Sequence, residues 1–331
     1  MRKVRIAQIG TSRNSHGSSI IKSLRKQSDI FEVVGYALPE NEREKFPDKM
    51  KYFDGLQEMT LEEILNDPTI EAVAVETEEI YLTKYAQLAA SAGKHMHMEK
   101  PGSQDPAAFE KMIETVRRNG TVFHTGYMYR YNPFVQELLE QIERGDLGQI
   151  LSVEAQMNCI HPKELRQWLE NFKGGMMFYL GCHLVDLIFR IQGQPEKVHT
   201  MNRCSGLDGV TAEDQGMAVL EYKNGISFAA TSAIQFGGFA RRELVVTGSK
   251  RTVSLCPLEM FHEDGGQFTT WTEYSDLSWA DRGTSRDCPS HDRYDGMMAS
   301  FAAMVRGEKE NPYTLDYELA LYKLVRQCCG F

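Results

Sequence analysis

Apolar positions follow two alternating periods in the first third of the chain. Short β-branched runs, typical of buried strands, alternate with segments whose apolar residues recur every three or four positions, as in a helix packed on one face. The pattern predicts strands over 3–10, 31–38, 70–77, 94–102 and 121–127, and helices over 18–27, 60–67, 81–93 and 106–119. Repeated strand–helix–strand units of this length favour an α/β fold with a doubly wound parallel sheet.

The periodicity changes after about residue 125. A predicted helix over 132–144 leads into longer strands with alternating apolar residues, and the run EYKNGISF contains an Asn-Gly pair typical of a hairpin turn. A last helix is predicted over 315–329. We therefore expect a second, α+β domain with an open, mostly antiparallel sheet. The expected boundaries are 1–124 and 125–331, with the final helix packed back on the first domain.

Composition and charge narrow the class of protein. The 331 residues are 42% hydrophobic and 25% charged, and the net charge of −9 argues against a general nucleic-acid binder, which needs a basic surface. The segment before the first strand is too short for a signal peptide, and no apolar run approaches the length of a membrane span. Seven scattered cysteines lack zinc spacings. We expect a cytoplasmic protein with reduced thiols, no membrane contact and no metal.

The turn GTSRNSHG (10–17) partly matches a dinucleotide-binding fingerprint. Gly10 occupies the first glycine position, whereas Ser12 and Ser15 replace the glycines that permit close phosphate approach and helix packing. Backbone N–H groups at a helix N-terminus, with Arg13 beside them, still suit a phosphate. The acidic ribose position aligns with Leu38, and the next acidic residue is Glu40. An ordinary polar turn remains the alternative interpretation.

Two further segments carry candidate chemistry. In MEKPG, Lys100 lies at the carboxyl end of a predicted parallel strand, where such sheets bind ligands, although a lone lysine is usually a solvated charge. In GGMMFYLGCHLVDLIFRIQG (174–193), helical spacing places Tyr179, His183 and Asp186 on one stripe. A carboxylate that orients an imidazole suits proton transfer, and a buried, satisfied histidine is the alternative. His161 precedes a proline in a polar loop. Trp168 suits either a sugar face or core packing.

These residues resemble a known family. The segments AGKHMHMEKP (92–101), GYMYRYNP (126–133), GDLGQI (145–150), GGMMFYLGCHLVD (174–186) and VTGSKRTVSL (246–255) are similar to those of the Gfo/Idh/MocA oxidoreductases. The resemblance implies an N-terminal Rossmann dinucleotide-binding domain and a C-terminal domain for substrate binding and oligomerisation. It implies NAD(P)-linked oxidation or reduction of a sugar, polyol or related carbonyl compound. Lys100 matches the catalytic lysine and His183 the acid/base histidine.

The chain departs from the family pattern at two places. The family commonly has aspartate four residues before the histidine, where this chain has Tyr179, which cannot act as a carboxylate at neutral pH. A Thr-Pro-Asn turn aligns with TEEIYL (77–82): Thr77 is kept, but Glu78 and Glu79 replace the next two residues. Two carboxylates beside the nicotinamide repel an anionic cofactor unless they point to solvent.

The leading hypothesis is an NAD(P)-dependent dehydrogenase, with NAD favoured over NADP, acting on a small carbohydrate-like substrate as a homodimer or homotetramer. Lys100, His183, Tyr179 and Asp186 form the predicted catalytic set. The predicted cofactor-binding residues are Gly10, Thr11, Ser12, Arg13, Asn14, Leu38, Thr77, Glu99, Lys100 and Pro101. The predicted substrate-binding residues are Arg130, His161, Trp168, Tyr179 and His183. Two alternatives are a glycoside-processing enzyme that uses tightly bound NAD without net redox change and a binding or regulatory protein that has lost the cofactor.

Overall fold

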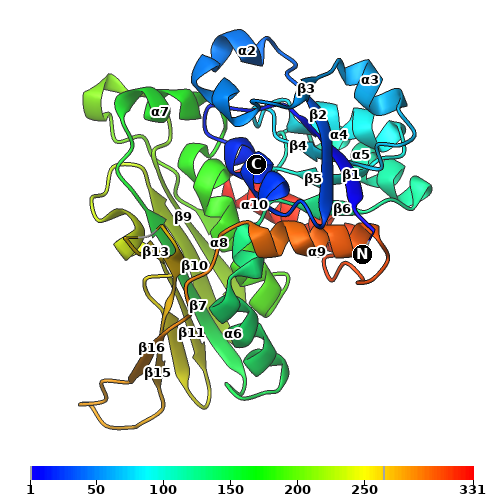
Figure 1. The fold of residues 1–331 in the computed structure, drawn as a ribbon. Helices are drawn as coiled ribbons and strands as arrows, with labels where there is room; N and C mark the ends of the chain where they lie inside the picture. Colours follow the sequence, from blue (N-terminus) through cyan, green and yellow to red (C-terminus); the bar gives the residue numbers. More distant parts are fainter. Residues whose placement is uncertain (1, 264) are drawn as a thin grey trace. The chain divides into compact units, whose positions relative to one another are not determined.

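Strands of the N-terminal third form a six-stranded parallel sheet with the order β3-β2-β1-β4-β5-β6 (Figure 1). The computed structural model describes residues 2–263 and 265–331. The strands are β1 (Val4–Ile9), β2 (Phe31–Ala37), β3 (Gln57–Glu58), β4 (Ala72–Val75), β5 (His95–Met98) and β6 (Phe123–Thr125). The five predicted strands are present, and the two-residue β3 is added. This order reverses direction at β1 and β4, where doubly wound sheets bind their ligands.

Helices connect and cover these strands. They are α1 (Gly17–Lys26), α2 (Glu42–Lys45), α3 (Leu61–Asn66), α4 (Leu82–Ser91), α5 (Pro106–Asn119) and α9 (Asp295–Val305), with a 3₁₀ turn at Pro47–Tyr52. Helix α4 packs against α5, and α1 packs against α9. The Thr60 hydroxyl accepts a hydrogen bond from the Glu63 N–H at 3.1 Å and the Glu63 carboxylate accepts one from the Thr60 N–H, as a capping box requires. This cap begins α3.

Residues divide into two compact units that are not continuous in sequence. The first unit comprises 1–128 and 294–319, and the second comprises 129–293 and 320–331. The division falls within the last helix, α10 (Leu315–Cys328). None of the helices in the described part of the chain is long and apolar enough to cross a membrane.

The second unit is built on an eight-stranded mixed sheet with the order β16-β15-β12-β11-β7-β10-β9-β8 (Figure 1). Neighbouring strands are antiparallel except β7 and β10. The strands are β7 (Ile150–Asn158), β8 (Lys197–Thr200), β9 (Gln215–Tyr222), β10 (Gly225–Ser232), β11 (Glu243–Gly248), β12 (Thr252–Leu255), β15 (Thr270–Tyr274) and β16 (Thr284–Asp287). A separate ribbon pairs β13 (Met260–Phe261) with β14 (Gln267–Phe268). The predicted α/β fold class is confirmed.

Helices of the second unit include α6 (Pro133–Glu143), α7 (Lys163–Trp168) and α8 (Cys182–Gln192), and a π-helical turn (Met177–Gly181) precedes α8. Helix α8 packs on β7 and β10. Short 3₁₀ turns lie at Met128–Tyr131, Leu169–Asn171, Leu207–Gly209 and Gly238–Arg241.

The predicted hairpin joins β9 to β10, but its turn lies one residue earlier than the Asn-Gly pair suggests. Tyr222 pairs with Gly225, so Lys223 and Asn224 form the loop. A Cβ at Gly225 would lie 1.7 Å from the Leu151 carbonyl oxygen. The glycine therefore serves close approach to β7 rather than a turn that requires a positive φ.

Residues 275–283, between β15 and β16, project from the sheet edge (Figure 1). Asp276 and Asp281 accept hydrogen bonds from N–H groups within this tip, which fixes its conformation. The side chains of Leu277 and Trp279 are fully exposed there. The tip therefore presents two large apolar side chains to solvent.

Candidate functional site

The turn after β1 retains the backbone shape of a dinucleotide-binding unit. Gly10 has a φ of +87°, and a Cβ at this position would lie 2.4 Å from the Thr77 Cγ2 atom. Only glycine therefore allows this turn to approach the turn after β4. The observation meets the requirement for the first fingerprint glycine, which supports a fit to the dinucleotide.

Serine hydroxyls accept hydrogen bonds from the backbone N–H groups of the same turn. The Ser12 hydroxyl accepts hydrogen bonds from Ser15 N at 2.8 Å and Asn14 N at 3.3 Å. The Ser15 hydroxyl accepts from Ser12 N at 3.3 Å and Gly17 N at 3.2 Å. A phosphate bound here would replace these hydroxyls as the acceptor. The exposed Arg13 lies beside them, and the cofactor roles of these residues stay predictions.

Glu42, which the sequence did not single out, reaches the turn from the first residue of α2. Its carboxylate accepts a hydrogen bond from Thr11 N at 3.0 Å. Burial raises the pKa of Glu42 to about 8, although the Thr11 N–H opposes the shift. Glu40, by contrast, accepts hydrogen bonds from Lys84 and Tyr85. No spacing rule distinguishes Glu42, because left-handed residues 40 and 41 return the chain to the turn.

Three buried glutamates, which we call the carboxylate cluster (Glu76, Glu79 and Glu99), follow strands β4 and β5. Each is at most 1% exposed. The carboxylate oxygens of Glu76 and Glu79 accept no hydrogen bond from the described residues. The aligned Glu78, by comparison, is half-buried. Glu79 therefore does not point to solvent, and Glu76 adds a carboxylate that the sequence analysis did not single out.

Burial sets the protonation of this cluster. It raises the pKa of Glu79 to about 8, although Lys100 opposes the shift, and it raises the pKa of Glu76 well above the usual value, helped by Glu99. Burial alone would raise the pKa of Glu99 too, but His16 at 3.4 Å and Lys100 at 3.7 Å outweigh it, and the pKa is lowered. The lowered pKa makes Glu99 the ionised member of the cluster, whereas a pKa of about 8 leaves Glu79 mostly protonated at pH 7.

Lys100 and His97 complete the surroundings of the cluster. Lys100 is 3% exposed at the end of β5, beside the carboxylate of Glu99. His97 Nε2 lies 3.5 Å from Glu76 Oε1, and its Nδ1 lies 2.8 Å from His124 Nδ1. Burial lowers the pKa of His97 to about 4, so that the ring is neutral. Lys100 is therefore not a solvated surface charge. Pro101, the next residue, is buried, and so is Thr77 in the turn after β4.

In the second unit, the predicted helix over 174–193 contains the π-helical turn Met177–Gly181. A π-turn bonds residue i to i+5 and widens the helix, so the spacing that places Tyr179 above His183 in a regular helix does not hold. The ring of Tyr129 lies edge-on to His183, with centroids 5.3 Å apart. Sequence reasoning missed Tyr129, although it lies within the GYMYRYNP motif.

The structure brings the predicted residues His161, Trp168 and Tyr179 together in one aromatic cluster. The Tyr179 centroid lies 5.3 Å from that of Trp168, edge-on, and 6.4 Å from that of His161. All three rings are half-buried. Burial lowers the pKa of His161 to about 4, and its Nε2 lies 3.2 Å from the Cys159 sulfur. The cluster offers apolar ring surface with polar edges, which suits a sugar face.

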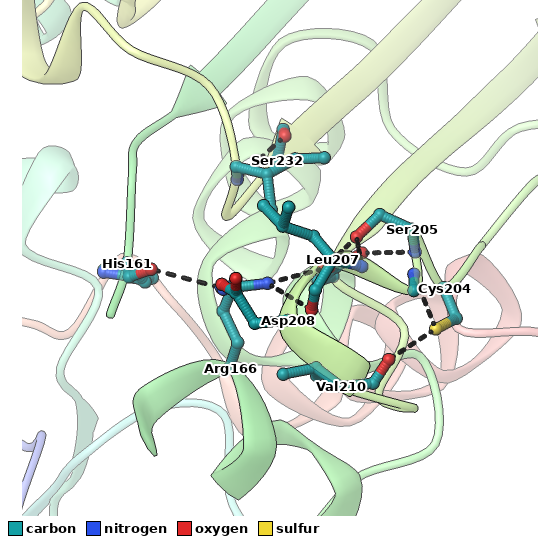
Figure 2. Close-up of polar contacts among 11 residues, drawn as sticks. His161, Arg166, Cys204, Ser205, Leu207, Asp208, Val210 and Ser232 are labelled. Carbon is teal, nitrogen blue, oxygen red and sulfur yellow. Dashed lines mark hydrogen bonds and ion pairs between the residues drawn. The ribbon is translucent and has the colours of Figure 1, made fainter. Parts of the chain in front are cut away.

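Arg166 anchors this aromatic cluster (Figure 2). Its Nε donates to the His161 carbonyl at 3.2 Å, its Nη1 donates to the Leu207 carbonyl at 3.1 Å, and its Nη2 contacts the Asp208 carboxylate. The side chain is 2% exposed. Arg166 thus ties α7, which carries Trp168, to the His161 segment and to the loop after β8. Nothing in the local sequence distinguishes it from a solvated arginine.

Asp186 and Arg130 form a buried ion pair. Arg130 Nε donates to Asp186 Oδ2 at 3.0 Å, and its Nη2 donates to Oδ1 at 2.7 Å, so the two groups meet as a fork. Both side chains are at most 2% exposed. The pairing gives Asp186 a partner that the sequence analysis did not foresee. That Asp186 orients His183 stays a prediction, and so does substrate contact by Arg130.

Family models match both parts of the chain. Residues 4–127 match the oxidoreductase family with an NAD-binding Rossmann fold, and residues 135–254 match the GFO/IDH/MocA C-terminal domain. The chain belongs to the Gfo/Idh/MocA family. This Gfo/Idh/MocA protein is therefore an oxidoreductase with an NAD-binding Rossmann domain, as the sequence resemblance implied.

Curated relatives of this Gfo/Idh/MocA protein are about one quarter identical to it. An uncharacterized oxidoreductase of Rhizobium meliloti is 26% identical over 80% of this chain and 78% of its own length. The NADP(+)-dependent scyllo-inositol 2-dehydrogenase of Bacillus subtilis is 27% identical over 54% of this chain and 48% of its own. The D-glucoside 3-dehydrogenase of Escherichia coli is 26% identical over 56% and 59%. These last two alignments span about half of each relative.

Solved structures support the fold across the whole chain. The UDP-N-acetylglucosamine 3-dehydrogenase of Acidithiobacillus ferrooxidans superposes with a TM-score of 0.77 over 99% of this chain and 97% of that one. The two are 18% identical, so the likeness is one of fold.

Proposed function

We propose that this protein is an NAD(P)-dependent dehydrogenase that acts on a CH–OH group of a sugar or polyol, with NAD favoured. The supporting observation is Lys100, a buried lysine at the carboxyl end of β5, held beside Glu99 in a Rossmann unit. Doubly wound sheets bind their ligands outside this edge. Gly10 supports the cofactor part of the proposal, because its turn has the required close approach to Thr77.

Each predicted catalytic residue has a distinct role in this proposal. The nicotinamide cofactor, when bound, supplies the hydride acceptor or donor. The ammonium of Lys100 donates a hydrogen bond to the substrate oxygen, and the Glu99 carboxylate lies 3.7 Å from that ammonium. His183 exchanges the hydroxyl proton. Tyr179 donates a hydrogen bond to the substrate. The Arg130–Asp186 ion pair holds helix α8, which carries His183, in position.

The aromatic cluster and the relatives support the proposed substrate class. His161, Trp168 and Tyr179 present half-buried ring faces, on which the apolar face of a pyranose or cyclitol stacks. The named relatives act on an inositol and a glucoside. The predicted assembly into a homodimer or homotetramer accords with exposed Met217 and Ile226 on β9 and β10.

The test is a Lys100→Met substitution. Turnover of inositols and glucosides should fall by about 10²–10⁴-fold, the usual contribution of a positioned acid–base group, while the affinity for cofactor stays within about threefold. Lys94→Met is the matched control, because Lys94 is also buried but donates to the Asp67 and Ile70 carbonyls. It should affect stability and leave kcat near that of the wild type. Unchanged turnover in Lys100→Met would refute the assignment.

A cofactor-free binding protein is the second candidate. It is favoured by the serine hydroxyls that already occupy N–H groups in the turn after β1. Titration of the purified protein with NAD(H) and NADP(H), followed by nicotinamide fluorescence, separates the candidates. Absence of binding by every form would favour this second function.

A further inference from the structure

The carboxylate cluster contains more acid than its surroundings neutralise. Glu76, Glu79 and Glu99 interact electrostatically with one another, all three interact with Lys100, and Glu99 also interacts with His16. A buried carboxyl group without a hydrogen-bond partner costs free energy, and such groups persist in native structures at functional sites. His97 Nε2, fully buried and without a hydrogen-bond partner among the described residues, faces Glu76 from the next strand.

The cluster also lies along the predicted course of the cofactor. The Ser15 hydroxyl of the turn after β1 donates to the Glu76 carbonyl at 3.3 Å, and Gly10 packs on Thr77. Glu79 and Lys100 interact directly through their charges. The proposed function places Lys100 at the substrate oxygen, which is bonded to the carbon that exchanges hydride, so the nicotinamide ring would lie near the same lysine. The ring is then also near Glu79 and Glu76.

We propose that Glu76 and Glu79 make this site discriminate between the redox states of its cofactor, binding the oxidised, cationic nicotinamide more tightly than the reduced, neutral one. The inference rests on the proposed function, because it takes Lys100 as the reacting centre. Oxidised and reduced dinucleotides differ by one positive charge on the ring. The anionic pyrophosphate is common to both forms, so the cluster changes their ratio of affinities even where it weakens both.

The preference for the oxidised cofactor is accompanied by the release of a proton when that cofactor binds. In the structure Glu79 is a neutral acid because burial outweighs its attraction to Lys100, with Glu99 and Glu78 adding repulsion. Burial also raises the pKa of Glu76, helped by Glu99 and Glu79 and opposed by Lys100, and the neutral His97 faces its carboxyl group. A cationic ring stabilises the carboxylate form. Binding of the oxidised cofactor therefore converts a carboxylic acid to a carboxylate and releases its proton to solvent, whereas the reduced cofactor leaves the acid protonated.

The experiment is calorimetric titration of the full chain at pH 7 with oxidised and reduced NAD, or NADP if the wild type binds that better. Each titration is run in two buffers of different ionisation enthalpy, which gives the number of protons exchanged. Wild-type protein should bind the oxidised form on the order of tenfold more tightly, as one charge interaction across a partly screened site allows. It should release protons with that form alone.

Variants assign the effect to the cluster. Glu79→Gln should lower the affinity ratio several-fold and reduce the proton release, and Glu76→Gln provides an independent measurement if the first variant folds poorly. Glu78→Gln, in the same turn but half-buried, is the comparison variant. Its repulsion is the smallest of the influences on Glu79, so it should change the affinity ratio and the proton release much less than Glu79→Gln does. An affinity ratio and proton release unchanged in both cluster variants would overturn the inference and leave the dehydrogenase proposal standing. A wild-type protein that binds neither form would overturn both.

Discussion

Buried carboxylates occur in both units, but Glu259 differs from Glu76 and Glu79 in whether it accepts hydrogen bonds. In the second unit, Glu259 is 2% exposed and accepts hydrogen bonds from Tyr129, Arg242, Arg293 and Gln267. In the first unit, Glu76 and Glu79 are equally buried and have no hydrogen-bond partner among the described residues.

This contrast separates structural carboxylates from candidate functional ones. Burial alone would raise the pKa of Glu259, but Arg293 and Arg242 outweigh it, and the pKa is lowered. Burial raises the pKa of Glu79 instead, because Lys100 offers too little compensation. A fully paired buried carboxylate stabilises one conformation. An unpaired one gains its interaction when a ligand arrives, so the first unit carries the unsatisfied chemistry.

The largest expected effect is on stability. Glu259→Gln should lower the free energy of unfolding by about 3 kcal/mol, because it leaves the buried Arg242 and the half-buried Arg293 beside a neutral group. Glu79→Gln should leave that free energy unchanged or raise it, since it removes an unpaired acid. Urea denaturation of the two variants and the wild type gives the comparison. Equal destabilisation by both substitutions would contradict the distinction between the units.

The next effect is a pair of opposite pH dependences. The folded-state pKa of about 8 for Glu79 exceeds the ordinary 4.5, so the folded state holds more protons, and stability should decline as pH rises from about 4.5 to 8. Glu259 has a lowered pKa, so its contribution is present above about 4.5 and is lost as pH falls through its folded pKa.

Urea denaturation at several pH values measures both dependences. Glu79→Gln should flatten the decline between pH 5 and 8, although Glu42, with a pKa of about 8, retains part of it. Glu259→Gln should flatten only the loss on the acid side. A decline above pH 5 that persists unchanged in Glu79→Gln would show that Glu79 is ionised in the folded protein.

A smaller effect is expected at the other buried pair of the second unit. Arg130→Lys replaces the fork on Asp186 by a single ammonium, and should cost about 1–2 kcal/mol of unfolding free energy. The affinity for cofactor should not change. Thermal denaturation measures the loss, and an unaltered midpoint would indicate that the fork contributes little to stability.

The sequence predicts local structure well because local rules determine it. The strand–helix alternation, the Thr60 cap and the β9–β10 hairpin each follow from neighbouring residues. The hairpin turn lies one residue before the predicted position, because Gly225 is in a strand and packs closely against the Leu151 carbonyl. The π-turn before α8 likewise has no clear signature in the apolar pattern, which continues through it.

The candidate site is less predictable from sequence. Lys100 and Tyr179 follow from motifs, and His161 and Trp168 are singled out by residue type. Glu76 and Glu42 follow from neither, because charged residues are normally assigned to the surface. The burial of Glu76 depends on which strands are neighbours in the sheet, and that of Glu42 depends on the left-handed residues 40 and 41. Arg166 is missed for the same reason, since two of its partners, Leu207 and Asp208, lie more than forty positions away in the loop after β8.

The three tryptophans lie in three different environments. Trp168 lies edge-on to Tyr179 in the aromatic cluster, Trp271 is 2% exposed, and Trp279 is fully exposed at the tip between β15 and β16. The intrinsic fluorescence of the protein is therefore the sum of three tryptophan emissions. An aqueous quencher separates them, because it reduces the emission of exposed tryptophans more than that of buried ones. In a Trp279→Phe variant the exposed contribution disappears, and the remaining quenchable emission comes from Trp168. A carbohydrate that stacks on the aromatic cluster would then be visible as a change in the light from a single indole.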